Sequence, residues 1–352
     1  MTGLGALLVQ PLRNWDGVWY AVIAEHGYEV HPATTAFWPL YPLMLRYGSQ
    51  LTDWTVPVVG VVLSNVAFLL ALIVLYRLVR IDYGDAVAAR TTWLVALFPT
   101  AFFFSATYTE ALFLLLTVTA IYLGRTDRWG LAGLTGLLAG ATRNTGFLVL
   151  IPLGLLLIRR YGWNPGRWWR NAVKLAAVPI GPALYLLYLD RLWGNPLITL
   201  DVQREWERYR ALPWETVATA LRAVDLSWFD RLLANPSWAT LTSTGVRTSF
   251  ANGGVLDLAV LATFVPLALY MLVRVRPAYS LYAVVSLTIP LFSPSTINAL
   301  LSISRFVLVL FPFFIALSLL LTNRWVFRAV LAVSTLLLVI LTVQFATWYW
   351  VA

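Results

Sequence analysis

Ten apolar stretches alternate with short polar loops along this 352-residue chain, and this alternation restricts the folds that the chain can adopt. An apolar helix of about 20 residues is long enough to cross the hydrocarbon layer of a bilayer, which is ~30 Å thick. Hydrophobic residues make up 60% of the chain and charged residues 12%, whereas about a quarter of the residues of soluble domains are charged. The sequence therefore predicts an all-α, polytopic membrane protein.

The predicted membrane segments leave little of the chain for a separate soluble domain. They are residues 56–80, 86–104, 107–124, 129–143, 145–158, 172–189, 255–273, 278–293, 306–322 and 328–347. Residues 4–12 are also apolar but too short to span, and we expect them to be the end of a further membrane helix that begins before this sequence. The expectation is one integral membrane domain, residues 1–352, with about 10–11 membrane segments.

The positively charged loop residues gather on one side of the predicted segments. These residues are Arg77, Arg80, Arg90, Arg125, Arg128, Arg159, Arg160, Arg167, Arg170, Lys174, Arg274, Arg276, Arg324 and Arg328. Because cytoplasmic loops are enriched in Lys and Arg, this side is predicted to be cytoplasmic. The net charge of +9 is spread over these short loops rather than concentrated in one patch, so we expect no nucleic-acid partner.

Residues 129–158 are predicted to enter the membrane and return. Arg125 and Arg128 precede the segment and Arg159 and Arg160 follow it, so both of its ends are cytoplasmic. The turn then falls at residues 143–146. Because each limb has only some 14 residues, the hairpin is expected to be buried among other helices, where broken backbone is tolerated.

Two longer segments lie on the other, extracytoplasmic side and are expected to carry short interfacial helices. The first, residues 13–55, contains Trp15, Asp16 and both histidines of the chain. The second, residues 190–254, is predicted to form helices over 201–211, 214–223 and 228–234. Asp201 and Ser227 are candidate N-caps for two of them.

Asp16 is the most conspicuous acidic residue of the first outer segment. Residues 17–26 are predicted to be a helix, with Asp16 as its N-cap and Gly27 just after its end. The alternative function is a general base that accepts a proton from a hydroxyl group. Both roles are compatible if one carboxylate oxygen stays free.

Metal binding is an alternative for the same segment. Glu25, His26 and His31 could join Asp16 as ligands, but their spacing matches no zinc signature. The chain has no cysteine, which excludes thiolate sites and disulfides. We therefore expect no metal and no other cofactor.

Three charged residues lie at the outer ends of membrane segments, away from the cytoplasmic set. Glu110 at the edge of the apolar region is expected either to pair with an arginine or to face a cavity. Arg143 and Arg305 either extend to the membrane surface or bind a phosphate there through the guanidinium fork. Arg143, at the turn of the buried hairpin, is the stronger candidate.

Aromatic residues are abundant, with 17 Trp, 16 Tyr and 18 Phe, and most are explained as a membrane-interface belt. Trp15, Trp38, Tyr41 and Trp206 are candidates for stacking on a sugar ring. There is no P-loop and no dinucleotide fingerprint. Glycines 133, 136 and 140 are expected to mark close helix–helix contacts.

The order of these motifs resembles that of the PIG-V family, the mannosyltransferases that add the second mannose of glycosylphosphatidylinositol, and their prokaryotic relatives. The motifs are Trp15-Asp16-Gly17, Glu25-His26-Gly27-Tyr28, Phe37-Trp38-Pro39-Leu40-Tyr41-Pro42, Phe98-Pro99-Thr100 with Tyr108-Thr109-Glu110, Thr142-Arg143-Asn144-Thr145-Gly146, Gly194-Asn195-Pro196-Leu197 with Gln203, and Ser302-Ile303-Ser304-Arg305-Phe306. The resemblance departs at the N-terminus, where the family has a full spanning helix before Arg13.

The resemblance implies a GT-C type glycosyltransferase. Such an enzyme transfers a hexose, here mannose, from a polyprenyl- or dolichyl-phosphate carrier to a lipid-linked or glycolipid acceptor, with inversion, at the non-cytoplasmic face. The general base of the family corresponds to Asp16, and Arg143 and Arg305 are candidates for the donor phosphate. The other candidate substrate-binding or supporting residues are Trp15, Glu25, His26, Tyr28, Trp38, Glu110, Asn144, Gln203 and Trp206.

Two other classes of function fit parts of the pattern. A transporter or flippase of lipid-linked sugars would also be polytopic, but transporters often show internal repeats and charges near the bilayer midplane, and this chain shows neither. A membrane scaffold would need no acidic motif beside a phosphate-compatible arginine. The sequence favours the glycosyltransferase.

Overall fold

The computed structural model describes residues 9–223, 227–237 and 254–351 of the chain. Within these ranges all regular structure is helical, and the β-type pairing is limited to an isolated antiparallel bridge between Arg208 and Ser295. The predicted all-α class is confirmed. Residues 4–8 of the apolar N-terminal segment lie outside the described residues. The helix predicted at 228–234 is confirmed as α13 (Ser227–Ala234), and the side chain of its predicted N-cap, Ser227, lies outside the described part.

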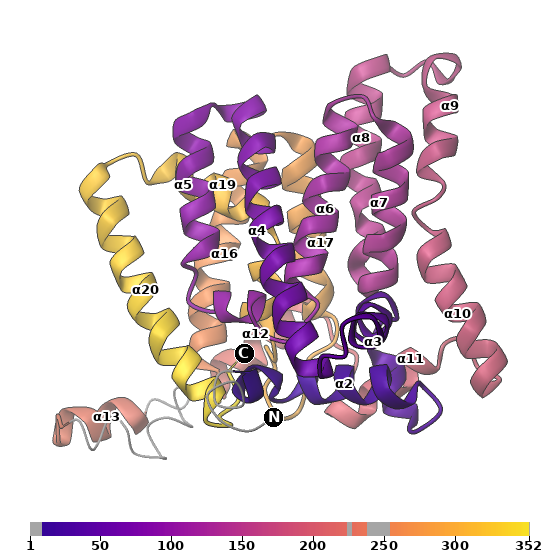
Figure 1. Ribbon diagram of the computed structural model, residues 1–352. Helices are drawn as coiled ribbons and strands as arrows, with labels where there is room; N and C mark the ends of the chain where they lie inside the picture. Colours follow the sequence, from indigo (N-terminus) through magenta and orange to yellow (C-terminus); the bar gives the residue numbers. More distant parts are fainter. Residues whose placement is uncertain (1–8, 224–226, 238–253, 352) are drawn as a thin grey trace.

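Each predicted apolar range contains a helix or a pair of helices, and these stand side by side in Figure 1. They are α4 (Val56–Tyr83), α5 (Asp85–Ala96), α6 (Glu110–Arg125), α7 (Trp129–Thr142), α8 (Leu150–Tyr161), α9 (Pro165–Leu175), α10 (Ile180–Trp193), α16 (Val255–Arg274), α17 (Pro277–Leu291), α18 (Ile303–Leu308), α19 (Phe311–Leu320) and α20 (Arg324–Ala346). The hairpin predicted over 129–158 is α7 and α8, with its turn at Arg143.

Not all of these helices are long enough to cross a bilayer alone. Among the described residues, four are long and apolar enough: α4, residues 144–161, α16 and α20. The pair α9–α10, bent by 41°, makes a fifth if it is one span. The 16 residues of α6 and the 14 of α7 fall short of the ~20 required. The chain is an integral membrane protein, but fewer of its helices are full spans than the sequence predicted, since several break inside the bundle.

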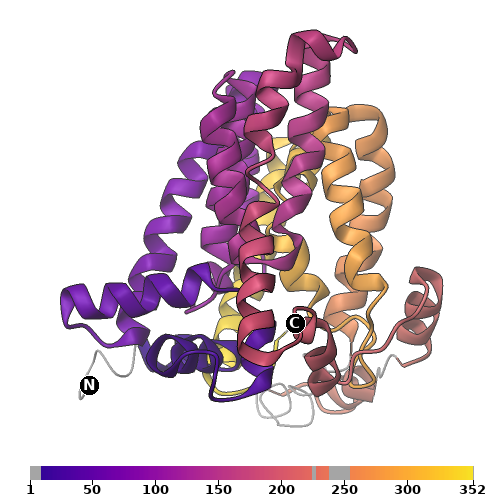
Figure 2. The same ribbon diagram turned by 90° about the vertical axis from the view of Figure 1, so that its right-hand side faces the viewer.

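Shorter elements lie across one end of the bundle, beneath the upright helices in Figures 1 and 2. They include η1 (Gln10–Arg13), α2 (Asp16–His26), η2 (Pro32–Ala36), α3 (Leu40–Thr52), α11 (Ile198–Asp201), η5 (Val202–Trp206), α12 (Pro213–Arg222) and α13 (Ser227–Ala234), and two further 3₁₀ turns, η3 (Ala101–Phe104) and η4 (Asn144–Val149), connect membrane helices. This end, called the lower end below, therefore carries both predicted outer segments.

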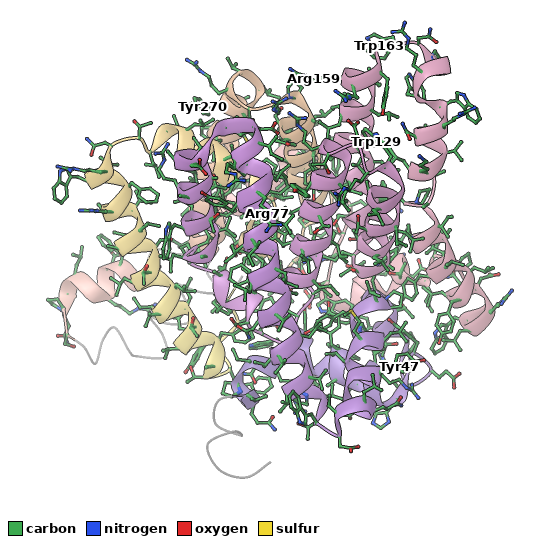
Figure 3. The ribbon with its side chains drawn as sticks, turned by 45° about the horizontal axis from the view of Figure 1, so that its top comes forward. Tyr47, Arg77, Trp129, Arg159, Trp163 and Tyr270 are labelled. Carbon is green, nitrogen blue, oxygen red and sulfur yellow. The ribbon has the colours of Figure 1, made fainter. Side chains whose placement is uncertain are left out.

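The basic loop residues lie at the opposite, upper end. Figure 3 labels Arg159 and Trp163 there, and Tyr47 of α3 at the lower end. This separation follows from the chain path, since α4, α6, α8 and α16 all end near the basic loops. The lower end carries the charged residues of the two predicted outer segments, including Asp16 (Figure 1).

Close packing around α7 depends on glycines, as predicted. A Cβ atom at Gly133 would lie 2.1 Å from the carbonyl oxygen of Lys174. A Cβ at Gly181 would lie 2.2 Å from the carbonyl oxygen of Leu137. Backbones that approach so closely leave no room for a side chain, so α7 and the α9–α10 pair pack through small residues.

The second outer segment differs from its prediction in one place. The helix at 214–223 is confirmed as α12. The single helix predicted over 201–211 is wrong: α11 ends at Asp201, η5 ends at Trp206, and Glu207 then takes a left-handed conformation with φ of 52°. Asp201 stands at the N-cap position of η5, but its side chain makes no capping hydrogen bond. Its Oδ2 accepts a hydrogen bond from Nδ2 of Asn195 instead. The break carries the chain across to residues 292–296.

Candidate active site

Asp16 is the first residue of α2, and its position is set by an unusual backbone turn. Trp15 has φ of 60°, a left-handed value that is uncommon for a residue with a side chain. Its indole ring packs against the rings of Trp348 and Trp350, with centroids 5.8 and 5.3 Å away. The other end of the chain therefore holds the strained turn that aims Asp16.

Tyr108 fixes the same turn from the other side. Its buried hydroxyl donates to the carbonyl oxygen of Asn14 (2.9 Å) and accepts from the backbone N–H of Asp16 (3.1 Å). The predicted helix of residues 17–26 is confirmed, with Gly27 at its C-cap. The predicted N-cap role of Asp16 is wrong, because Trp15 is the N-cap residue and no side chain caps the helix. The carboxylate of Asp16 is thus available for other contacts.

Asp16 belongs to a chain of ion pairs with Arg305, Glu110 and Arg143, called the ion-pair network below. Oδ2 of Asp16 accepts from Nη1 of Arg305 at 2.6 Å. Oε1 of Glu110 lies 3.0 Å from Nε of Arg305 and accepts from Nη1 of Arg143 at 2.9 Å. The expectation that Glu110 pairs with an arginine is confirmed, and it pairs with two.

The ion-pair network is removed from bulk water. The side chain of Glu110 is 1% exposed, and those of Arg143, Arg305 and Asp16 are 11%, 12% and 16% exposed. Asp16 and Glu110 each lie in the first turn of a helix, where the positive end of the helix dipole stabilises a negative charge. Both arginines also lie over the ring of Phe306, at 5.5 and 6.0 Å from its centroid. Two carboxylates and two guanidinium groups therefore balance in a site of low polarity.

A cavity of about 2050 Å³ opens beside the network at the lower end. It is lined by Asp16, Arg143 and Arg305, and also by the predicted residues Trp15, Trp38, Asn144, Gln203 and Trp206. Its size exceeds the ~300–1,000 Å³ typical of small-molecule pockets, so it has room for two substrates or for part of a lipid chain. Among the described residues, Oδ1 of Asp16 has no protein hydrogen-bond partner and remains available to a ligand.

Glu25, His26, Tyr28, Tyr41 and Glu110 were singled out from the sequence but do not line this cavity. Glu110 contacts two residues of the cavity wall, Arg143 and Arg305. Tyr41 is fully buried, with its hydroxyl 2.9 Å from that of Ser64, so it offers no surface for a sugar ring.

Glu25 and His26 are at the far end of α2, both exposed, with Nε2 of His26 3.8 Å from Oε2 of Glu25. Tyr28 is buried, and its hydroxyl donates to the carbonyl oxygen of Phe37 at 2.7 Å. These contacts give Tyr28 a role in holding the outer segment together rather than a surface that faces the cavity.

The alternative metal site does not assemble in the described part of the chain. In those residues, no group of three or more His, Asp or Glu side chains is arranged to hold a metal ion. His31 uses Nδ1 to accept from the backbone N–H of Ala33, so that nitrogen is occupied in capping η2.

One site residue was not predicted from the sequence. Arg208 follows η5 and lines the cavity, and its Nη1 and Nη2 donate to the carbonyl oxygens of Ser293 (2.7 Å) and Leu301 (3.3 Å). Burial lowers the pKa of Arg208 to about 10, with the positive charge of Arg305 adding to the shift and the carboxylate of Asp16 opposing it. In the sequence, Arg208 is one of several charged residues in a polar segment, and nothing there marks it as a partly buried residue of a cavity wall.

Asp257 was also missed, although it lies close behind the network. It is 1% exposed in the first turn of α16, and its two oxygens accept from the backbone N–H of Ser304 (3.2 Å) and from Nδ2 of Asn298 (3.1 Å). Because Ser304 precedes Arg305, this carboxylate holds the turn of α18 that carries the arginine. Asp257 therefore positions a residue of the network.

Comparison with known proteins bears on this arrangement. Residues 4–150 match the family model described as "Mannosyltransferase (PIG-V)". Over that region, the chain is similar to the PIG-V mannosyltransferases. The matched region includes Asp16, Glu110 and Arg143, whereas Arg208 and Arg305 come from beyond it.

Similarity to individual relatives also covers less than half of the chain. The chain is 36% identical over 158 residues to GPI mannosyltransferase 2 of Cryptococcus neoformans, covering 41% of this chain and 36% of the relative. It is 32% identical over 160 residues to GPI alpha-1,6-mannosyltransferase 2 of Mus musculus, covering 43% of this chain and 32% of the relative. The chain thus spans about a third of the length of these relatives.

Proposed function

We propose that this chain is a membrane mannosyltransferase that takes a mannosyl group from a polyprenyl- or dolichyl-phosphate carrier and transfers it, with inversion, to a lipid-linked or glycolipid acceptor. The observation that carries the proposal is the carboxylate of Asp16, which faces a large cavity with Oδ1 free while Arg305 holds Oδ2. The similarity to GPI mannosyltransferases supports the sugar and the reaction class.

In the proposed reaction, Asp16 acts as general base. Oδ1 takes the proton of an acceptor hydroxyl, and the acceptor oxygen attacks the anomeric carbon from the face opposite to the phosphate. The bond between the anomeric carbon and the phosphate oxygen breaks, and its electron pair stays on the leaving lipid phosphate. One bond forms as one breaks at that carbon, so its configuration inverts.

Arg305 and Arg143 are proposed to stabilise the charge that develops on the leaving phosphate. Arg305 is well placed for this role because it contacts Asp16 directly, so the base and the cation are held in one geometry. Fixed groups of this kind need little reorganisation during the reaction. Arg143 lines the cavity from the turn of the α7–α8 hairpin. No nucleotide sugar is needed as donor.

The reaction is proposed to occur at the extracytoplasmic face. The support is the separation of charges along the bundle: the cavity lies at the lower end, and the basic loops that the positive-inside rule assigns to the cytoplasm lie at the upper end.

The decisive experiment is transfer from radiolabelled polyprenyl-phosphate mannose to a lipid extract by the purified protein in liposomes. General-base catalysis typically contributes ~10²–10⁴-fold, so Asp16→Asn is expected to lower the transfer rate by that factor while donor binding persists. Asp53→Asn is the matched control, because Asp53 is an exposed carboxylate of the same segment, away from the cavity. Near wild-type transfer by Asp16→Asn would refute the assignment.

The same assay, carried out both in detergent and in liposomes, separates the enzyme from a flippase. An enzyme forms a new mannosylated product in detergent, where no membrane separates two compartments. A flippase moves intact donor across liposomes and leaves the mannose on its original carrier. Movement of the donor without a new product would replace the proposed function by transport.

A further inference from the structure

The ion-pair network has no net positive charge to balance a phosphate, although both of its arginines line the cavity. Asp16 and Glu110 carry two negative charges, and Arg143 and Arg305 carry two positive charges, linked in a chain by three ion pairs. A polyprenyl-phosphate sugar is a phosphodiester with one negative charge. If only this network received it, one buried negative charge would stay uncompensated, which is costly in a medium of low polarity.

Arg208 supplies a positive charge that forms no ion pair within the described part of the chain. Among the described residues, its guanidinium contacts two backbone carbonyl oxygens and no acidic side chain lies within ion-pair distance. A guanidinium has five N–H donors, so up to three remain for a ligand. With its pKa near 10, Arg208 is protonated at neutral pH. The remaining charged side chains of the cavity wall are exposed and balanced: Arg204, Arg210, Asp201 and Glu215.

The side chain of Arg208 is not the sole link between its loop and residues 292–301 in the described structure. Backbone hydrogen bonds already join this loop to residues 292–296: Tyr209 donates to the carbonyl oxygen of Pro294, and Ala211 to that of Phe292. Partly burying a cation without an ion-pair partner is unfavourable for folding, so the presence of Arg208 at a cavity wall indicates an anionic ligand.

We propose that Arg208 is the residue that binds the donor phosphate, with Arg305 as its neighbour on the other side of the phosphate; this rests on the proposed function. Together with the network, Arg208 leaves one net positive charge, which matches a phosphodiester. During transfer, Asp16 gains the acceptor proton while the leaving phosphate gains a second negative charge. The site and its ligands thus remain neutral before and after the reaction.

The proposal predicts that Arg208 recognises the phosphate and not the lipid chain. The test compares polyprenyl phosphate with the uncharged polyprenol of the same length, each as a competitor for bound donor. Wild-type protein is expected to bind the phosphate more tightly than the alcohol. Arg208→Gln is expected to lower the ratio of the affinity for polyprenyl phosphate to the affinity for polyprenol by roughly 10- to 100-fold, because a charge-assisted contact is lost. The affinity for polyprenol itself is expected to stay unchanged.

Two further variants separate charge from structure. Arg208→Lys keeps the charge without the fork geometry and is expected to recover part of the ratio, whereas a purely structural arginine would give equal loss in both variants. Arg222→Gln removes an exposed positive charge from α12, outside the cavity, and is expected to behave as wild type.

A measurement on the wild-type protein covers the case in which the variants fail to fold. Polyprenyl phosphate is expected to protect Arg208 from an arginine-specific dicarbonyl reagent, detected by mass spectrometry, whereas polyprenol gives no protection. An unchanged ratio in Arg208→Gln, or equal modification of Arg208 with and without polyprenyl phosphate, would overturn the assignment. If Arg208 is protected but no mannose is transferred, the proposed function fails and the phosphate site stands.

Discussion

Glu110 allows a quantitative test of the ion-pair network, because it is the buried carboxylate that joins two arginines. Glu110→Gln leaves Arg143 and Arg305 with Asp16 as their remaining carboxylate in the network. Removing one partner of a buried ion pair typically destabilises a protein by about 3–5 kcal/mol. Arg143→Gln is expected to destabilise less, since Glu110 stays paired with Arg305. The double variant restores charge balance and is therefore expected to be more stable than Glu110→Gln alone.

The measurement is a double-mutant cycle of unfolding free energies in mixed micelles with increasing SDS, followed by the fluorescence of the 17 tryptophans. The expected coupling energy between Glu110 and Arg143 is about 2–3 kcal/mol. The control is the exposed pair of Arg160 and Asp127, at a similar 2.8 Å but 63% and 39% exposed. Its coupling is expected to be below about 1 kcal/mol. If the effects of Glu110→Gln and Arg143→Gln simply add, the account of the network as a charge-balanced unit is wrong.

Three further predictions concern topology, packing and positioning. The chain has no cysteine, so Tyr47→Cys and Trp163→Cys each introduce a single exposed thiol. An impermeant maleimide added to intact cells should label position 47 and not position 163. The reverse labelling pattern would invert the proposed orientation. Gly146→Ala should destabilise the α7–α8 hairpin by about 1–3 kcal/mol or more, because its Cβ would lie 2.1 Å from the carbonyl oxygen of Ala139. Gly154→Ala, with open space around its Cβ, should be neutral or stabilising in the same unfolding measurement. Equal effects of the two substitutions would contradict the packing argument. Asp257→Ala should lower the transfer rate by letting Arg305 shift. Asp257→Asn retains an acceptor for the N–H of Ser304 and should keep most of the transfer rate. Indistinguishable rates in the two variants would leave Asp257 without a positioning role.

The positions of the helices and the separation of charge followed from local properties of the sequence. Apolar runs and loop arginines are visible residue by residue, and each acts through its own transfer free energy into lipid or its own attraction to the cytoplasmic side. The same holds for the α7–α8 hairpin, because basic residues at both ends of 129–158 require the chain to return. Full span lengths could not be predicted in this way, because breaks inside a bundle depend on the neighbours that cover them.

The partners of the charged groups were decided by the tertiary structure. Asp16 and Arg305 are 289 positions apart, and no local pattern links them. The N-cap prediction for Asp16 failed because Trp348 and Trp350 hold Trp15 in a left-handed turn from the far end of the chain. Electrostatic energy depends on distance and burial in space, so the balance of charge in the site, and the charge of Arg208 without an ion-pair partner among the described residues, exist only once the helices are packed.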